Sequence, residues 1–165
     1  MHKTINVMGI SPGTRYIGFA VFYGSDLMDW GIKNIEGKGS KRKIVKAVSV
    51  ISDLIGQYGT DVLSIKKLHP SRSSPNLDML VCRIKGLSEM EGLRVFQYSI
   101  GELEGFFCPN RRINRRDLIE IVAERYPILF YELDRERTSI NPYHIRMFEA
   151  VALGSICLNH LYRKR

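Results

Sequence analysis

An α/β fold is predicted from the order of patterns along the chain, with three antiparallel strands followed by two parallel ones. Three short apolar segments come first and are joined by tight turns, which is typical of an antiparallel meander. Segments with helical spacing then alternate with apolar strands, and a crossover helix between two strands implies that they pair in parallel. We therefore expect one five-stranded mixed sheet flanked by helices.

The meander strands occupy the first third of the chain. Residues 4–10 are mostly apolar, and residues 16–23 are rich in the aromatic and β-branched side chains that favour strands. A Gly-Ser-Asp turn at residues 24–26 leads into a third strand over residues 27–35.

Helical spacing begins after the meander and alternates with two further strands. Residues 40–58 place apolar side chains on one face and basic ones on another, and Ser40 is positioned to cap this helix. Residues 61–65 form an apolar run typical of a buried strand, residues 77–87 repeat apolar residues at helical spacing, and residues 93–98 return to a strand. These two strands form the predicted parallel half of the sheet.

Two helices complete the predicted fold. Asn114 is placed to cap a helix over residues 114–125, and Asn141-Pro142 opens a last helix over residues 143–162. This order of elements resembles the plan of the ribonuclease H-like fold. The resemblance implies that the ends of the first and fourth strands and the last helix converge on one site.

The composition is that of one globular domain, which we expect to span residues 1–165. With 44% hydrophobic and 25% charged residues, the chain is neither a disordered tail nor a small disulfide-bonded protein. No apolar run is long enough for a signal sequence or a membrane span, so we expect a cytoplasmic protein without membrane contact. The three cysteines lack the C-x-x-C spacing, so neither a disulfide framework nor a zinc site is indicated.

The net charge is +8, from 25 Lys and Arg against 17 Asp and Glu. Such an excess indicates either simple solubility or a polyanionic partner such as nucleic acid. Two basic clusters contribute to it: Lys33, Lys38, Lys41, Arg42, Lys43 and Lys46 in one, and Arg111, Arg112, Arg115 and Arg116 in the other. Each cluster alone is as consistent with a solvated face as with a phosphate-binding one.

The end of the first predicted strand carries the most specific motif in the chain. Residues 9–20 read GISPGTRYIGFA, with Pro12, Gly13, Arg15 and Gly18 in order. This segment resembles the opening of the RuvC family of Holliday-junction resolvases, whose pattern is G-I-D-P-G-[ST]-R followed by a second glycine. Ser11 stands where that family has a metal-binding aspartate, and a neutral hydroxyl is a poor sole ligand for Mg²⁺.

The end of the fourth predicted strand departs from the family pattern in the same direction. The resemblance implies a glutamate after this strand, and the chain has Lys66 and Lys67 there. The polar loop that follows, residues 68–77, contains His69, Arg72 and three serines. These side chains are phosphate donors if the loop contacts nucleic acid, and otherwise an ordinary surface loop accounts for them.

The last predicted helix keeps one of the two aspartates that the resemblance implies. Residues three apart share a helical face, so both family carboxylates approach one metal. Here Arg146 aligns with the first aspartate and Glu149 with the second. Ala150, Ala152 and Gly154 are small enough to let this helix lie close to the sheet.

The leading interpretation is a nucleic-acid-binding protein whose two-metal nuclease centre is lost or replaced, with DNA, branched DNA included, as its partner and no resident cofactor. Tethered cations would hold phosphate where the resemblance implies Mg²⁺. The predicted contacts are Ser11, Thr14, Arg15, Lys66, Lys67, His69, Arg72, Arg111, Arg112, Arg115, Arg116 and Arg146.

Two other interpretations stay open. The chain is alternatively an active, Mg²⁺-dependent junction nuclease with an unorthodox site, in which Glu149 is catalytic. The carboxylates available to join Glu149 are then Asp26, Asp29 and Asp78, and the candidate general bases are His69 and His144. The third interpretation is a scaffold or interaction subunit. Family resolvases act as dimers, which suggests a homodimer for this chain.

Overall fold

The core of the fold is a mixed sheet, described here from a computed structural model that covers residues 3–138 and 144–163. The strands are β1 (Asn6–Ser11), β2 (Tyr16–Tyr23), β3 (Asp26–Asn34), β4 (Val62–Lys66) and β5 (Arg94–Tyr98). They lie in the order β3-β2-β1-β4-β5. The first three pair antiparallel, whereas β4 pairs parallel with both β1 and β5. The predicted fold class is therefore confirmed.

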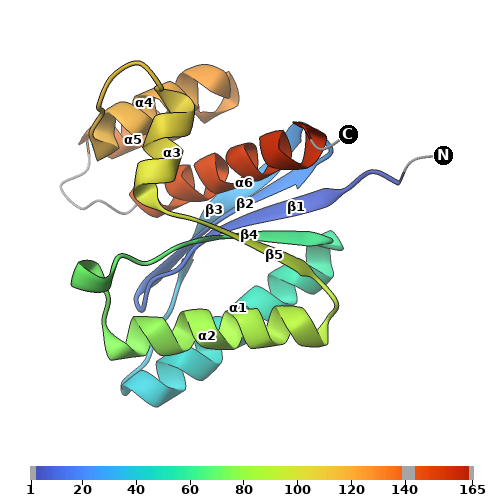
Figure 1. Cartoon of the computed structure of the whole chain (residues 1–165). Helices are drawn as coiled ribbons and strands as arrows, with labels where there is room; N and C mark the ends of the chain where they lie inside the picture. Colours follow the sequence, from blue (N-terminus) through green and yellow to red (C-terminus); the bar gives the residue numbers. More distant parts are fainter. Residues whose placement is uncertain (1–2, 139–143, 164–165) are drawn as a thin grey trace.

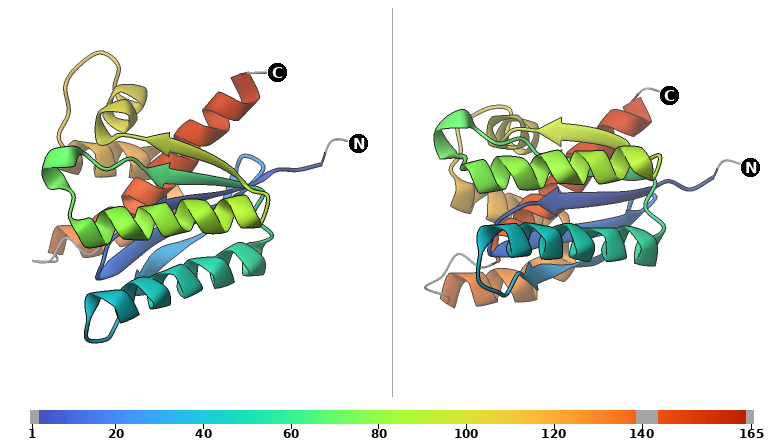
Figure 2. Two further views of the ribbon diagram at one scale, coloured as in Figure 1. Left: turned by 60° about the horizontal axis from the view of Figure 1, so that its bottom comes forward. Right: turned by 90° about the horizontal axis from the view of Figure 1, so that it is seen from below.

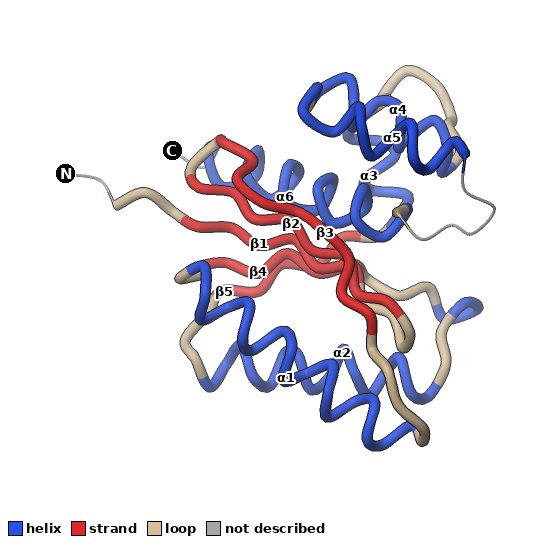
Figure 3. Tube along the Cα trace, turned by 180° about the vertical axis from the view of Figure 1, so that it is seen from behind, coloured by secondary structure: helices blue, strands red, loops and turns tan. Residues whose placement is uncertain are grey.

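Helices cover both faces of the sheet. The helices are α1 (Ser40–Tyr58), α2 (Pro75–Met90), α3 (Ile100–Phe107), α4 (Arg115–Arg125), α5 (Phe130–Thr138) and α6 (Ile145–Arg163), with 3-10 turns η1 (Pro70–Arg72) and η2 (Pro127–Leu129). Figure 1 shows α1 and α2 on one face and α6 on the other, and Figure 3 shows α3, α4 and α5 beyond α6. Within the described residues, no helix combines the length and apolar character needed to cross a membrane.

The two ends of the sheet differ in what lies beside them. In both views of Figure 2, η1 and the starts of α1 and α2 lie at one end, and the chain termini lie at the other. The carboxyl ends of β1 and β4 point toward the first of these ends, because the two strands are parallel. Both strands therefore finish at the end of the sheet where η1 lies.

Alternation along the strands divides the core into two apolar layers. Met8 and Ile10 of β1 belong to the layer that includes buried residues of α1 and α2, whereas Val7 belongs to the layer on the α6 side. Successive strand residues point to opposite faces, so Ser11 at the end of β1 also faces α6. By the same alternation Lys66, at the end of β4, faces α6.

Glycines let α6 approach the sheet closely. A Cβ on Gly9 would lie 2.0 Å from the carbonyl oxygen of Ala150, and one on Gly18 would lie 2.1 Å from that of Arg146. Any larger residue would therefore displace the helix. Ser64 Oγ also donates a 2.8 Å hydrogen bond to the Leu153 carbonyl oxygen in the interior. These contacts fix the height of α6 above β1, β2 and β4, as its small residues predict.

Several details differ from the prediction. Ser40 is the first residue of α1 rather than its cap; the cap position is Gly39, which has no side chain to accept a hydrogen bond. Asn114 caps α4 as predicted, with its side chain accepting from the Asp117 backbone N–H. The predicted start of the last helix at Asn141-Pro142 lies outside the described residues, which resume at His144.

Two short helices, α3 and α5, are absent from the prediction. α3 is eight residues long and begins two residues after β5, so it offers too few turns for a periodic pattern. Its start is nevertheless marked by Ser99 and Glu102, which form a reciprocal capping box. α5 follows the 3-10 turn that begins at Pro127, and its mixed, strongly polar sequence gives little periodic signal.

Candidate nucleic-acid interface

A groove of about 690 Å³ opens at the end of the sheet where β1 and β4 finish. The loop after β4, the start of α6 and the starts of α3 and α4 border it. The basic residues that line it are Lys66, Lys67, His69, Arg72, Arg115 and Arg146. Glu102 is the one acidic residue in the described lining, so the five Lys and Arg side chains give the lining a net positive charge.

The innermost charges of the groove form an ion pair between β4 and α6. Lys66 Nζ lies 2.6 Å from Glu149 Oε2, and the two side chains are 15% and 3% exposed. The contact is ionic rather than an aligned hydrogen bond, since Oε2 has no hydrogen-bond partner among the described residues. A buried carboxylate thus lies beneath an ammonium group that borders the groove.

Arg146 lies beside this pair, at the start of α6. Its Nη1 donates a 2.8 Å hydrogen bond to the carbonyl oxygen of Pro12. The loop between β1 and β2 has a glycine next to this guanidinium group: a Cβ on Gly13 would lie 2.6 Å from the Arg146 Cζ. Burial lowers the pKa of Arg146 below its ordinary value; Glu149 opposes this and Arg115 adds to it. Because guanidinium groups titrate far above neutral pH, Arg146 stays charged.

Ser11 is a correction to the predicted contacts. It is fully buried, and its Oγ has no hydrogen-bond partner among the described residues. A side chain without exposed surface cannot touch a ligand in the groove. Ser11 lies on the α6 side of β1, where the resemblance implies a metal-binding aspartate, and it supplies no charge there.

The side chains present do not fit a site for two divalent cations. Such sites need several anionic oxygens around ions a few ångströms apart. No group of three or more His, Cys, Asp or Glu side chains suited to a metal occurs within the described part of the chain. Of the described residues at the aligned positions, Ser11, Lys66 and Arg146 carry no carboxylate and Glu149 is the one that does; it already faces the Lys66 ammonium group.

The loop after β4 forms the outer rim of the groove. The Lys67 backbone N–H donates to the Tyr98 carbonyl oxygen at 2.7 Å, which ties this loop to β5. His69 Nδ1 accepts from the Ser71 backbone N–H at 3.1 Å and so caps η1. The side chains of Lys67, His69 and Arg72 are exposed. Lys67 and Arg72 thus present positive charge to solvent from a backbone that is anchored at Lys67 and at η1.

The opposite wall comes from the starts of α3 and α4. Ser99, Ile100, Gly101 and Glu102 line it from α3, and Arg115 lines it as the first residue of α4. Asn114 and Asp117 form a capping box that orients this first turn. Arg115 is exposed, and it acts on the Arg146 guanidinium as a like charge. Two positive groups therefore face the same space.

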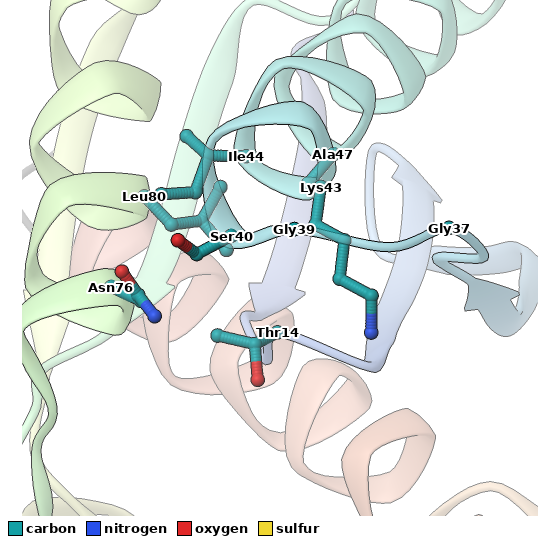
Figure 4. Close-up of a pocket in the computed structure, with 9 residues that line it drawn as sticks. All are labelled: Thr14, Gly37, Gly39, Ser40, Lys43, Ile44, Ala47, Asn76 and Leu80. Atoms are coloured by element: carbon teal, nitrogen blue, oxygen red, sulfur yellow. The ribbon is translucent and has the colours of Figure 1, made fainter.

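Five other predicted contacts lie outside the groove. Thr14 borders a separate hollow at the start of α1 (Figure 4). The remaining four, Arg15, Arg111, Arg112 and Arg116, are exposed but do not line the groove. Arg111 Nη1 lies 3.9 Å from Asp117 Oδ2, a weak surface ion pair.

The alternative acidic residues are not gathered around Glu149. Asp26 begins β3 beside the end of β2, and Asp29 accepts a hydrogen bond from the Tyr58 hydroxyl at the end of α1, so both lie away from the end where β1 and β4 finish. Asp78, in the first turn of α2, accepts a hydrogen bond from Ser73. The ring of His144 lies within 3.5 Å of the carboxylates of Glu132 and Glu136 on α5, away from the groove lining.

The sequence does not predict two features of the groove. The Lys66-Glu149 pair joins positions 83 residues apart (149 minus 66), and a single sequence gives no sign of which cation meets which carboxylate. The wall made by α3 could have been found, because Ser99 and Glu102 have the spacing of a capping box.

Comparison with solved structures identifies the fold. Thermus thermophilus RuvC in complex with a Holliday junction substrate matches with a TM-score of 0.70 and 11% identity, covering 97% of this chain and 95% of that one. The yeast mitochondrial Holliday junction resolvase gives 0.70 and 11%, covering 99% and 84%. The fowlpox virus resolvase in complex with Holliday junction DNA gives 0.66 and 13%, covering 95% and 99%.

These similarities establish a RuvC-type, ribonuclease H-like fold over nearly the whole chain. Sequence comparison adds nothing to this assignment, since neither a protein-family model nor a curated protein matches the chain.

Proposed function

We propose that this protein binds the sugar-phosphate backbone of DNA, branched DNA in particular, in the groove at the ends of β1 and β4, and that tethered cations replace metal ions there. The observation that carries the proposal is the ion pair in which Lys66 Nζ lies 2.6 Å from Glu149 Oε2. It puts a protein ammonium group against the carboxylate that the family pattern assigns to a metal.

The charge of the groove supports a phosphate ligand. Six basic residues and one acidic residue line it in the described chain. Lys67, Arg72 and Arg115 are exposed at the rim, so they can release bound anions and accept a backbone phosphate without first breaking a buried contact. Phosphate contacts of this kind position a nucleic acid without reading its sequence.

The fold supports DNA as the nucleic acid. Thermus thermophilus RuvC and the fowlpox virus resolvase, which share the fold, have each been solved with Holliday junction DNA.

The three cysteines are free, as expected of a protein in the reducing cytoplasm, where we place this one. A homodimer is part of the proposal by the same analogy of fold.

A salt titration tests the proposal. The affinity for a labelled four-way DNA junction should be measured by fluorescence anisotropy at several salt concentrations, together with the double variant Lys67→Ala/Arg72→Ala. The logarithm of affinity should fall linearly with the logarithm of salt, and the variant should reduce the slope by about 2. A matched control is Arg83→Ala/Arg163→Ala, which removes two exposed charges outside the groove. Absence of binding at low salt would refute the proposal.

Junction cleavage is the competing activity, and Glu149 is the residue on which it would depend. Its carboxylate is 3% exposed and lies at the point where β1, β4 and α6 meet, which is the observation in favour of this activity. Cleavage of the same junction in Mg²⁺ or Mn²⁺ that is lost in Glu149→Gln would establish the protein as a nuclease. Binding without cleavage in either ion supports replacement of the metal centre.

A further inference from the structure

A second basic surface lies at the start of α1. It consists of Lys38, Lys41, Arg42 and Lys46, and we call it the α1 patch. All four side chains are exposed. Within the described residues no carboxylate forms an ion pair with any of them, although Lys46 Nζ donates to the Glu36 carbonyl oxygen at 3.3 Å. The patch therefore has positive charge that the protein itself does not neutralise.

A hollow of about 280 Å³ lies next to the patch, between α1, α2 and the loop that joins β1 to β2. Figure 4 shows the Ser40 and Thr14 hydroxyls, the Asn76 amide and the Lys43 ammonium group around it. These groups are hydrogen-bond donors of the kinds that contact phosphate oxygens in nucleic-acid complexes. Polar donors and uncompensated charge thus occur on one surface.

The groove and this hollow share a wall. In the loop after β1, Pro12 lines the groove and Thr14 lines the hollow. In the first turn of α2, Leu77 lines the groove and its neighbour Asn76 lines the hollow. The two concave surfaces therefore adjoin each other at the same end of the sheet, with the β1-β2 loop and the start of α2 between them.

The start of α1 adds to the positive potential of the patch. Its cap position is Gly39, so no side chain accepts from the first backbone N–H groups, and its first turn contains no acidic residue. Helix starts carry partial positive charge and usually attract acidic residues. Here Lys41 and Arg42 occupy the first turn instead, which is unfavourable for the isolated helix unless an anion lies nearby.

We infer that the α1 patch binds a second segment of the sugar-phosphate backbone of the same nucleic acid that occupies the groove. The inference rests on the proposed function of the groove. Because a wall separates the two surfaces, one straight backbone does not follow both, and the ligand that fits them is branched or sharply bent. The patch thereby distinguishes a junction from a simple duplex by contact with backbone alone, without reading bases.

The test compares two double variants on two ligands. Lys41→Ala/Arg42→Ala removes two charges of the α1 patch, and Arg83→Ala/Arg163→Ala is the matched control with two exposed charges removed elsewhere. Binding to a four-way DNA junction and to one linear duplex of the same arm length is measured over a salt series. The patch variant should reduce the salt slope for the junction by about 2 and leave the slope for the duplex unchanged, while the control changes neither.

Each other outcome overturns the inference in a recognisable way. An unchanged junction slope in the patch variant, with the slope reduced in Lys67→Ala/Arg72→Ala, rejects the patch and keeps the proposed function. Equal reductions on junction and duplex mean that one backbone segment reaches both surfaces. If poly-glutamate displaces the labelled junction from the unaltered protein as well as unlabelled junction does, the α1 patch is a general anion surface whose partner is an acidic protein. If the unaltered protein binds neither ligand, the proposed function itself fails.

Discussion

The inner and outer parts of the groove both carry cations, but their side chains differ in what they contact. Inside, Lys66 is paired with Glu149, and Arg146 donates to the Pro12 carbonyl oxygen. At the rim, Lys67 and Arg72 are exposed and have no ion-pair partner among the described residues. The inner cations are part of the folded structure, and the outer ones are available to a ligand. Substitutions should therefore affect stability inside and affinity outside.

The largest effect on stability is expected at Lys66. Lys66→Met leaves the Glu149 carboxylate buried without its partner, and removing one member of a buried pair costs about 3 kcal/mol or more. Lys66→Met/Glu149→Leu removes both charges and should recover most of that loss, because the uncompensated charge is gone. Urea unfolding of the two variants measures the difference. A single variant that loses less than about 1 kcal/mol contradicts a stabilising inner pair.

The next largest effect is expected where α6 rests on β2. Gly18→Ala introduces a Cβ that would lie 2.1 Å from the Arg146 carbonyl oxygen, so the start of α6 must shift. Overpacking of this kind costs about 1–3 kcal/mol. Gly56→Ala is the control, because it lies inside α1 with open space around it and should stabilise the protein by about 0.5–1 kcal/mol. Equal thermal unfolding midpoints for the two variants would show that α6 is not held this tightly.

A smaller effect is expected for Arg146→Lys. The substitution keeps the positive charge but loses the guanidinium group that spans the groove floor to the Pro12 carbonyl oxygen, so a loss of about 1 kcal/mol follows. The salt slope of junction binding should not change, since the number of charges is the same. A reduced salt slope with unchanged stability would contradict this assignment and would mean that Arg146 contacts the ligand, as the rim cations are proposed to do.

The smallest effect on stability is expected at the rim. Lys67→Ala/Arg72→Ala removes exposed side chains, and such surface substitutions stay within about 0.5 kcal/mol. The same variant is the one expected to reduce the salt slope by about 2. Calorimetric unfolding and binding on one preparation compare the two effects directly. A substantial loss of stability would mean that the rim cations, too, are structural.

The sequence predicts which residues lie near the groove better than it predicts the contacts between them. The strand patterns and the motif at residues 9–20 are enough to predict that β1 and β4 end at one site. Both signals depend on residues close together in the sequence, where periodicity and turn residues can be recognised. The Lys66-Glu149 pair and the burial of Ser11 depend on the height of α6 above the sheet, which the packing of Gly9 and Gly18 determines. The small residues of α6 predict a close approach to the sheet, but which side chains then meet depends on the packing of the assembled fold, so a single sequence cannot supply the pair or the burial.

The most direct test of replaced metal ions is the dependence of junction binding on divalent cations. The dissociation constant for the four-way junction is measured with a chelator and with Mg²⁺ or Mn²⁺ at constant ionic strength. Tethered cations in the groove predict equal or slightly weaker affinity in the divalent ions, because those ions compete for the same phosphates. Binding that disappears in the chelator and returns with Mg²⁺ would contradict the account, since the groove would then depend on a metal ion.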